Sequence, residues 1–495
     1  MQPEREAPTL AVMRKAHPIP LLLLAVLLAS CALNPVTGRQ ELSVVSPERE
    51  AAQGKDAAAQ VEREIGLVKD PKLTAYIERI GARLAQYSPR RDVAYRFFIA
   101  DMPEANAFAL PGGYIYVSRG LLALANSEDE VAGVIGHEIG HVAARHAAQR
   151  ETRAMGVGIL SVLGTIAAGM AGGAEAAQMA SQFGQVAGAG LIASYGRDQE
   201  RQSDQIGQDI AARAGWDPAG LADFLVTLER EGTLQSGKSR NPSFLDSHPQ
   251  PGERAVTARA HAAELPRGAE PRIAKGRAAY LERIEGILVG PDPAQGVFEK
   301  NVFVQPALDF AIEFPAGWQF KNTREAVAAG SPRRDAIIVL EMQGASGDPQ
   351  DAARRWQQAN RVGFVQSGAT RIGGWPAFRG LAQAQTQQGS IALDVTFIQH
   401  PSGTYRITAM TSPSLYRSAA PIFASVAQSF RAIRADERER AKPMRLRVVA
   451  ARSGESLPEL DRRTANRWKL NETAVANALA EDARLGAGQL VKIAK

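Results

Sequence analysis

The N-terminal half of the chain places apolar residues at helical spacing. Over residues 48–87 the apolar positions that follow this period are Val61, Ile65, Leu73, Ile77 and Ile80, and they predict helix across the stretch. Further on, Ser127 and Glu130 have the spacing of a capping box, which predicts a helix from there to about Arg150. A second strong helix is predicted over 198–214, just before a glycine and a proline.

Shorter runs of β-branched and aromatic residues predict strands, at 93–100 and 114–117 in the N-terminal half. A composition shift near 291–296 suggests a boundary. Beyond it we expect an α+β domain, closed by an amphipathic helix over 421–433. The strands predicted in that domain are 307–314, 337–342, 391–399 and 405–410.

The chain has 495 residues, a length that fits about three domains. We expect an α+β protein in which a mainly helical domain with a small edge sheet covers 48–290. An α+β domain then covers 300–435, and a small module covers 443–495.

The first thirty residues have the pattern of an export signal. Met13-Arg14-Lys15 is a short basic segment, 21–28 is almost purely aliphatic, and Leu28-Ala29-Ser30 leads to Cys31. This ending resembles a bacterial lipobox, so we expect removal of 1–30 and lipidation of Cys31. Residues 31–47 would then be a tether to the periplasmic side of the outer membrane. The alternative is an ordinary signal peptide with an incidental cysteine.

The composition of the chain argues against two kinds of interaction. The formal net charge is +6, but no block of lysine and arginine with interleaved aromatics occurs, so we expect no nucleic-acid partner. The single cysteine excludes an intramolecular disulfide and a cysteine-based zinc knuckle.

The stretch 155–174 is uncharged and rich in glycine. Its length could cross a membrane, but its glycines leave it only weakly hydrophobic. We expect a mobile helical hairpin or lid over a cleft, since glycine lowers helix stability. A membrane span is the alternative.

The capped helix contains the sequence H-E-x-x-H. His137 and His141 are four positions apart, which places them about 40° from each other around a helix, so both imidazoles can reach one ion. Imidazole is a good ligand for zinc, and Glu138 can reach a zinc-bound water as general base. The alternative interpretation is an amphipathic helix that carries two exposed histidines and binds no metal.

A third ligand must come from elsewhere, because Ala144 and Ala147 replace the glycine and histidine of the metzincin pattern. His146 lies about 140° around the helix from His141, so we expect it off the ligand face, as a polar surface or supporting residue. On the second helix Glu200 can ligate zinc, and Asp204 can accept a hydrogen bond from a ligand histidine.

Four ordered motifs over roughly residues 50–265 resemble the HtpX/CAAX-prenyl-protease family of zinc metallopeptidases. The four motifs are HEIGH at 137–141, ERQSD at 200–204, the run from Asn106-Ala107-Phe108 to Tyr114, and Ser247-His248-Pro249 with Glu253-Arg254. With the lipobox, the chain is similar to the periplasmic lipoprotein branch of that family.

The resemblance implies a gluzincin-type fold that holds one zinc ion per chain. It implies His137, His141 and Glu200 as ligands, Glu138 as catalytic base, and Asp204 as a residue that supports the site or assists proton transfer. His248 would be either a fourth ligand in a resting state or a stabiliser of the oxyanion. It also implies a substrate-binding edge strand, with Asn106, Ala107, Phe108 and Tyr114.

The C-terminal segments carry weaker resemblances. The run from Phe310 to Trp318 resembles PsbP-like domains. The run from Arg447 to Ile493 resembles a LysM module, which implies peptidoglycan as a further partner; a generic small helix–strand cap is the alternative.

Together these features predict a zinc-dependent endopeptidase whose substrates are misfolded, stalled or misassembled envelope proteins. The alternative from a different class is a zinc-stabilised periplasmic chaperone, or a peptidoglycan-anchored scaffold, whose site is latched by His248.

Overall fold

The computed structural model describes residues 45–152, 195–235, 243–386 and 389–495, together with 31–33, 36, 38 and 40–42. The predicted signal peptide and the glycine-rich stretch 155–174 lie outside these residues. So does the side chain of Cys31, whose backbone lies in β1 (Cys31–Leu33), antiparallel to β2 (Gln40–Leu42). Within the described residues no helix has the length and apolarity that a membrane crossing requires.

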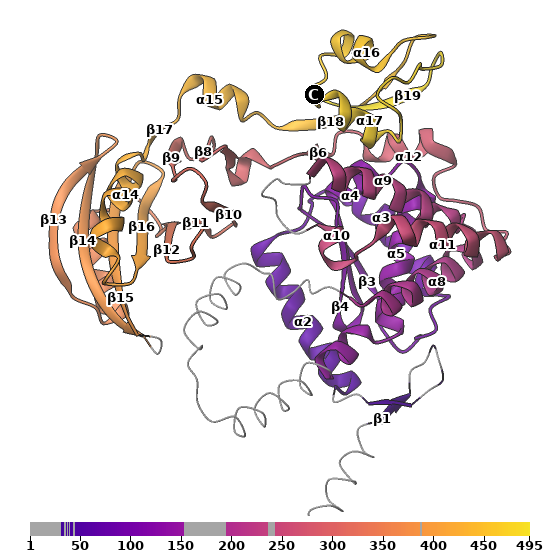
Figure 1. Ribbon diagram of the computed structural model, residues 1–495, viewed down its shortest axis with the longest axis horizontal. Coiled ribbons are helices and arrows are strands. Elements are labelled where there is room, and N and C mark those ends of the chain that lie inside the picture. The colour runs from indigo at the N-terminus through magenta and orange to yellow at the C-terminus, as the bar shows by residue number, and fades with distance from the viewer. Residues whose placement is uncertain are drawn as a thin grey trace, which may run out of the picture.

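Helices dominate the part of the chain before residue 290 (Figure 1). The helices are α2 (Pro47–Glu64), α3 (Pro71–Ala85), α4 (Arg119–Leu124), α5 (Glu128–Ala143), α8 (Arg197–Arg213), α9 (Ala219–Gln235), α10 (Phe244–Ser247), α11 (Pro251–Glu264) and α12 (Gly276–Ile284).

A small mixed sheet completes this helical part. Its strands are β3 (Arg96–Ala100), β4 (Ala107–Leu110) and β5 (Tyr114–Ser118) in the order β3-β5-β4, with β3 parallel and β4 antiparallel to β5. The turn η1 (Pro111–Gly113) joins β4 to β5, and α2 crosses it so closely that a Cβ on Gly54 would lie 1.8 Å from the carbonyl oxygen of Pro111. Strand β4 is therefore an edge strand whose end is held by α2.

Two predicted helices are shorter than the apolar pattern indicates. The stretch 48–87 is two helices, because the Asp70 carboxylate accepts the backbone N–H groups of Lys72 and Leu73 and so starts α3 at Pro71. The helix expected to reach Arg150 is interrupted: α5 ends at Ala143, Arg145 takes a left-handed conformation with φ of 55°, and residues 146–152 are helical again. The predicted second helix agrees with α8, whereas the strand expected at 93–100 begins only at Arg96.

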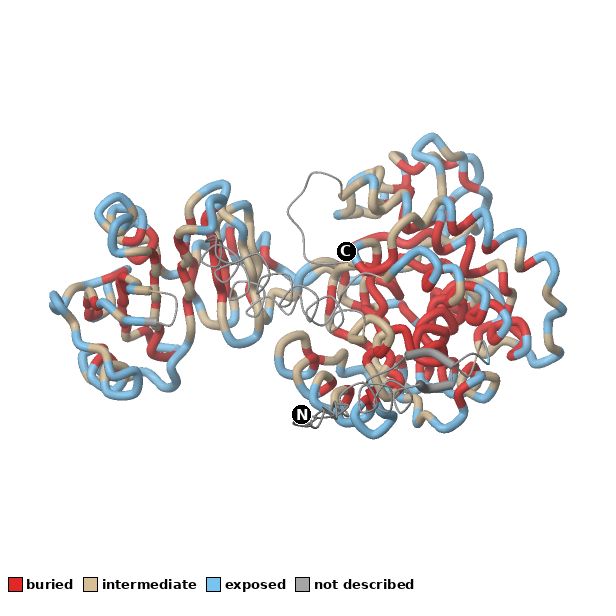
Figure 2. The backbone as a smooth tube through the Cα atoms, turned by 60° about the horizontal axis from the view of Figure 1, so that its bottom comes forward, coloured by how far each residue is buried: buried red, intermediate tan, exposed pale blue. Residues whose placement is uncertain are grey.

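Helix α5 is buried along nearly its whole length. It belongs to the larger part of the molecule, whose interior is formed by buried segments (Figure 2). The helix packs against α8 along a face of small residues. A Cβ on Gly207 would lie 2.5 Å from the backbone nitrogen of His137, and a Cβ on Gly140 would lie 2.9 Å from the carbonyl oxygen of Ser203. This close approach brings the start of α8 beside the histidines of α5.

The second part of the chain is built on antiparallel sheets. A seven-stranded sheet has the order β10-β11-β12-β16-β15-β14-β13, and a four-stranded sheet has the order β17-β9-β8-β7. The elements are β7 (Val297–Glu299), β8 (Val302–Gln305), β9 (Phe310–Glu313), β10 (Gln319–Asn322), β11 (Ala326–Gly330), β12 (Ala336–Met342), α13 (Pro349–Asn360), β13 (Phe364–Ile372), β14 (Trp375–Thr386), β15 (Gly389–His400), β16 (Gly403–Thr411), α14 (Tyr416–Gln428) and β17 (Arg431–Ala432).

The four strands expected in this part correspond to β9, β12, β15 and β16, although β9 is shorter than predicted. The helix expected at 421–433 is α14, which begins five residues earlier and ends at Gln428. The sequence patterns did not indicate β10, β11, β13 and β14. Helix α15 (Ala435–Arg440) then leads to the C-terminal module.

The last fifty residues have the order strand, helix, helix, strand, formed by β18 (Met444–Ala450), α16 (Leu457–Thr464), α17 (Leu470–Ala476) and β19 (Leu490–Ala494). Strand β18 lies between β19 and β6 (Leu288–Val289), so one sheet joins this module to the helical part. Leu446, Val475 and Ala494 belong to the same hydrophobic core as α5. The C-terminal module and the helical part therefore share a core.

Candidate metal centre

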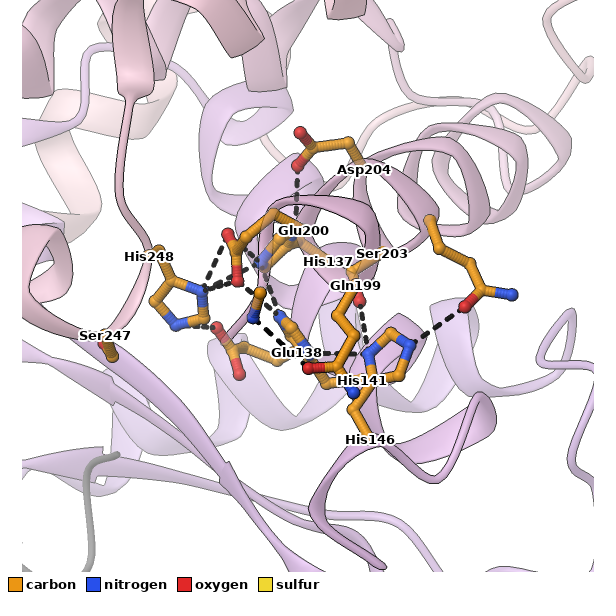
Figure 3. Close-up of polar contacts among 12 residues, drawn as sticks. His137, Glu138, His141, His146, Gln199, Glu200, Ser203, Asp204, Ser247 and His248 are labelled. Atoms are coloured by element: carbon orange, nitrogen blue, oxygen red, sulfur yellow. Dashed lines mark hydrogen bonds and ion pairs between the residues drawn. The ribbon is translucent and has the colours of Figure 1, made fainter. Parts of the chain in front are cut away.

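Helix α5 carries His137 and His141 on one face, four residues apart. Their Nε2 atoms lie 3.0 Å from each other, and both side chains are almost completely buried. The two nitrogens point toward one place in the core (Figure 3). The H-E-x-x-H spacing thus produces the convergence that its helical geometry predicts.

Glu200 on α8 and His248, the residue after α10, face the same place. Glu200 Oε1 lies 3.3 Å from His141 Nε2, and His248 Nδ1 lies 2.9 Å from Glu200 Oε1 and 3.2 Å from His137 Nε2. The four donor atoms all lie within 4.8 Å of one another. Three imidazole nitrogens and one carboxylate form a donor set typical of zinc.

Two buried polar groups beside the four donors bear on whether the site fits a metal. In the described part of the chain, both carboxylate oxygens of Glu138 and Nε2 of His248 are buried without a hydrogen-bond partner. His248 Nε2 lies 3.5 Å from Glu138 Oε1. Burial raises the pKa of Glu138 despite the nearby histidines. Since buried polar groups are nearly always paired, these residues fit a metal with a water beside Glu138.

Asp204 fixes the ring of His137. Its Oδ1 lies 2.8 Å from His137 Nδ1, so that nitrogen donates its N–H to Asp204 and leaves Nε2 free to ligate. Arg254 donates to both oxygens of Asp204, at 2.8 and 2.6 Å, and lies 2.5 Å from Glu200 Oε2. Burial alone would raise the pKa of Asp204, but Arg254 and His137 together lower it.

His146 does the same for His141. Its Nε2 donates to Gln202 Oε1 at 2.9 Å, so its Nδ1 is left to accept from His141 Nδ1, also at 2.9 Å. Burial holds the pKa of His141 well below its usual range, which keeps the ring neutral. The sequence predicts His146 off the ligand face, as a polar surface or supporting residue; because α5 ends at Ala143 and Arg145 is left-handed, the structure buries it against His141 as a supporting residue.

Two aromatic rings cover the centre, and no motif indicated either. Tyr195 stacks on His141 with ring centroids 3.8 Å apart, and Phe244 stacks on His248 with centroids 4.1 Å apart. The backbone N–H of Tyr195 donates to the carbonyl of Ser247 at 3.0 Å, which ties the chain before α8 to α10. None of the four donor residues is more than 2% exposed, so this conformation is closed.

The predicted substrate strand lies next to the centre. Ala107 and Phe108 belong to β4, Tyr114 begins β5, and Asn106 immediately precedes β4. Asn106 is fully buried, and both polar atoms of its side chain lack a partner among the described residues. A small cavity between the end of β4 and His141 is lined by Leu110, Pro111 and Tyr195 among others.

Residues 71–262 match the family described as Peptidase family M48. The "Beta-barrel assembly-enhancing protease" of Yersinia pestis is 33% identical over 248 residues, which cover 48% of this chain and 49% of that protein. "Metalloprotease LoiP" of Escherichia coli (strain K12) is 34% identical over 163 residues, or 33% of this chain and 60% of that protein. The chain spans about half the length of the first of these curated relatives.

Among solved structures, one match is the solution structure of cyanobacterial PsbP from Synechocystis sp. PCC 6803. The alignment covers 28% of this chain and 95% of the PsbP chain. Its sequence identity is 12% and its TM-score 0.24.

Proposed function

We propose that this chain, whose residues 71–262 belong to Peptidase family M48, is a zinc-dependent endopeptidase. The observation that carries the proposal is the convergence of His137, His141 and Glu200 beside Glu138, a buried carboxylate without a hydrogen-bond partner among the described residues. A site needed only for metal binding gains nothing from a buried and unsatisfied carboxylate next to it.

His137, His141 and Glu200 would hold the zinc. When bound, zinc supplies a Lewis acid that polarises the scissile carbonyl and lowers the pKa of water. Glu138 accepts the proton of the attacking water and passes it to the leaving amine. Its burial favours the protonated form and so helps it to hold that proton between the two steps.

His248 supports a latched resting state. Its Nδ1 lies among the other three donor atoms, where a fourth ligand would sit, and the site around it is closed. Peptide cleavage therefore requires His248 to move away from the other three donors.

The substrate would be held as an extended strand beside β4. Because β4 pairs with β5 on one side only, its other edge offers backbone N–H and C=O groups to a peptide. The cavity between Leu110 and His141 adjoins that edge, but its volume of about 10 Å³ holds no more than a water molecule, so a substrate side chain enters there only once the closed site opens.

We place the protein in the cell envelope, with misfolded or stalled envelope proteins as its substrates. This rests on the lipobox at Cys31 and on the relatives named for β-barrel assembly. The chain would be anchored to the periplasmic side of the outer membrane by acyl chains on Cys31. Metabolic labelling with a palmitate analogue should mark the wild type and leave Cys31→Ser unlabelled.

The C-terminal module is proposed to bind glycan chains of peptidoglycan. Support comes from its strand–helix–helix–strand order and its antiparallel pair of β18 and β19, together with the LysM-like sequence. Co-sedimentation of the full chain with purified peptidoglycan should deplete it from the supernatant, and a chain that stays in solution would contradict the assignment.

The test is zinc content and casein cleavage on the protein without residues 1–31. We compare wild type, Glu138→Gln and His248→Ala. We expect one zinc per chain in wild type and Glu138→Gln, loss of cleavage by at least about a hundredfold in Glu138→Gln, and faster cleavage in His248→Ala.

Two results would redirect the assignment. Bound zinc with no cleavage in any of the three proteins would favour a zinc-stabilised chaperone or scaffold. Absence of bound metal would contradict the metal centre itself.

A further inference from the structure

A cavity of about 390 Å³ lies where the C-terminal module meets the helical part. Its walls come from α4, α9 and the turn α10 on one side, and from α17 and the residues before it on the other (Figure 1). It is separate from the metal centre, since no zinc donor lines it. None of the functions proposed above uses this cavity.

The walls are apolar and acidic. Leu228, Leu245 and Trp468 are among the residues that contribute apolar surface, and carboxyl groups come from Glu104, Glu231 and Glu472. No lysine or arginine is among the described residues that line it, although the chain as a whole carries a net charge of +6. A ligand that fits must bring an apolar group and positive charge.

Two of these carboxylates, those of Glu231 and Glu472, can accept further hydrogen bonds. Glu231 Oε1 accepts from Gln235 Nε2 at 2.9 Å, and Glu472 Oε2 accepts from the backbone N–H of Lys469 at 3.1 Å. Across the residues that the structure describes, neither is in an ion pair. Each can therefore receive a cationic group, and in a partly desolvated cavity such a contact is stronger than at the open surface.

We propose that this cavity is an effector site for a peptide segment of a partner protein, in which an apolar side chain is flanked by basic residues. We further propose that its occupancy moves the turn that carries His248. The second statement rests on the latched peptidase proposed above, whereas the first does not.

The turn α10 lies between the cavity and the metal centre. Leu245 lines the cavity and packs on α9 so closely that a Cβ on Gly232 would lie 2.3 Å from its Cδ1. Its neighbour Phe244 donates its backbone N–H to the carbonyl of Ala105, another wall of the cavity, at 3.0 Å. A ligand that displaces Leu245 or Ala105 must therefore displace Phe244.

Phe244 in turn holds His248. Its carbonyl accepts the backbone N–H of His248 at 2.8 Å, and its ring stacks on the imidazole. Movement of the turn thus reaches the fourth donor position through a single side chain.

Hydrogen exchange on the full, zinc-loaded chain tests the binding. The probes are the peptide Lys-Leu-Trp-Lys and its charge-reversed counterpart Glu-Leu-Trp-Glu. We expect the basic peptide alone to slow exchange at 228–235 and 468–476. Equal protection by both peptides, or none by either, would overturn the effector site.

Charge reversal tests the location. Glu231→Lys and Glu472→Lys should each weaken binding of the basic peptide by at least about tenfold. Glu229→Lys, an exposed carboxylate on the same helix, should leave it unchanged. Unchanged affinity in both cavity variants would show that the peptide binds elsewhere.

The visible spectrum of the cobalt-substituted chain tests the coupling, because it reports the number and type of ligands. The basic peptide should shift the wild-type bands toward those of His248→Ala. Protection without a spectral change would overturn the coupling. Neither readout needs proteolysis, so an inactive chain would contradict the proposed peptidase and leave the effector site standing.

Discussion

Single side chains around the metal centre settle which nitrogen of each histidine faces the metal. Asp204 accepts a hydrogen bond from the Nδ1–H of His137, and His146 Nδ1 accepts one from the Nδ1–H of His141, so both rings present Nε2. A histidine ring that is free to rotate or to change tautomer binds zinc less tightly, because it must first be ordered. Through these hydrogen bonds, Asp204 and His146 would influence zinc affinity without touching the metal.

Replacing Asp204 should weaken zinc binding. Asp204→Asn removes the negative charge that holds the His137 N–H, and we expect an affinity about 10–100-fold lower. The measurement is competition with a chromophoric chelator. Asp209→Asn, on the same helix but exposed and paired with half-buried His261, should keep the wild-type affinity. Equal affinities in the two variants would show that Asp204 does not support His137.

The residues predicted from the sequence come together where their spacing is local. His137, Glu138 and His141 follow from one helix, and Glu200 and Asp204 from another. Tyr195 and the buried position of His146 could not be predicted, because they depend on where α5 ends and on contacts with distant residues. A helix pattern carries no sign of the left-handed turn at Arg145.

At the level of elements, α5 and α8 can approach because their shared face is nearly free of side chains. Gly136 and Gly140 of α5 lie against Gly207 and Ser203 of α8, with backbone atoms in direct contact. The distance between ligands on two helices is thus set by glycine packing, which leaves no side chain able to adjust.

A methyl group in that interface should be costly. Gly207→Ala places a Cβ 2.5 Å from the His137 nitrogen, and we expect the free energy of unfolding to fall by about 1–3 kcal/mol. Urea denaturation measures this free energy. At exposed Gly363, outside any helix or strand, an added Cβ would meet nothing within 4 Å, so Gly363→Ala should be nearly neutral. A Gly207→Ala protein as stable as wild type would mean that the helices can move apart.

Helix α2 is fastened to the end of α5 by a buried charge cluster. Glu50 accepts from Arg90 at 2.8 Å and from Arg145 at 3.3 Å, and Arg145 also donates to the carbonyl of Val45 at 2.7 Å. The cluster stabilises the turn that buries His146.

Removing the carboxylate of Glu50 deprives the buried Arg90 and Arg145 of their shared partner. Glu50→Ala should lower the free energy of unfolding by about 3–5 kcal/mol in thermal or urea denaturation. Exposed Glu62 on the same helix supplies the control, since Glu62→Ala should stay within about 0.5 kcal/mol of wild type. Comparable losses in both variants would rule out a special role for the cluster.

At the scale of the whole molecule, the C-terminal module completes the core of the helical part. Lys492 on β19 is fully buried, and its Nζ donates to the carbonyls of Ala123, Leu124 and Ala125 at the end of α4, at 2.9, 2.9 and 2.7 Å. Burial holds the pKa of Lys492 well below its usual range. The sequence predicts a small C-terminal module, but not this contact, because the two segments are more than three hundred residues apart.

Removal of the Lys492 side-chain amine should destabilise the helical part. Lys492→Met leaves three carbonyls without their donor, and we expect a loss of about 3 kcal/mol in the free energy of unfolding, with faster hydrogen exchange in α4. Lys469→Met, at an exposed position of the same module, should change neither. If α4 exchanged at the wild-type rate in Lys492→Met, the two parts would be independent in stability.

The burial of all four donors in one core has a thermodynamic consequence of its own. Because the donors come from three separate elements, only the folded chain assembles them, and the binding of zinc is linked to folding by mass action. Free zinc at a hundred times its dissociation constant would add about 2.7 kcal/mol to stability. The supply of metal thus determines how much of the protein stays folded as well as how much of it carries zinc, so a shortage of zinc would deplete the protein by unfolding.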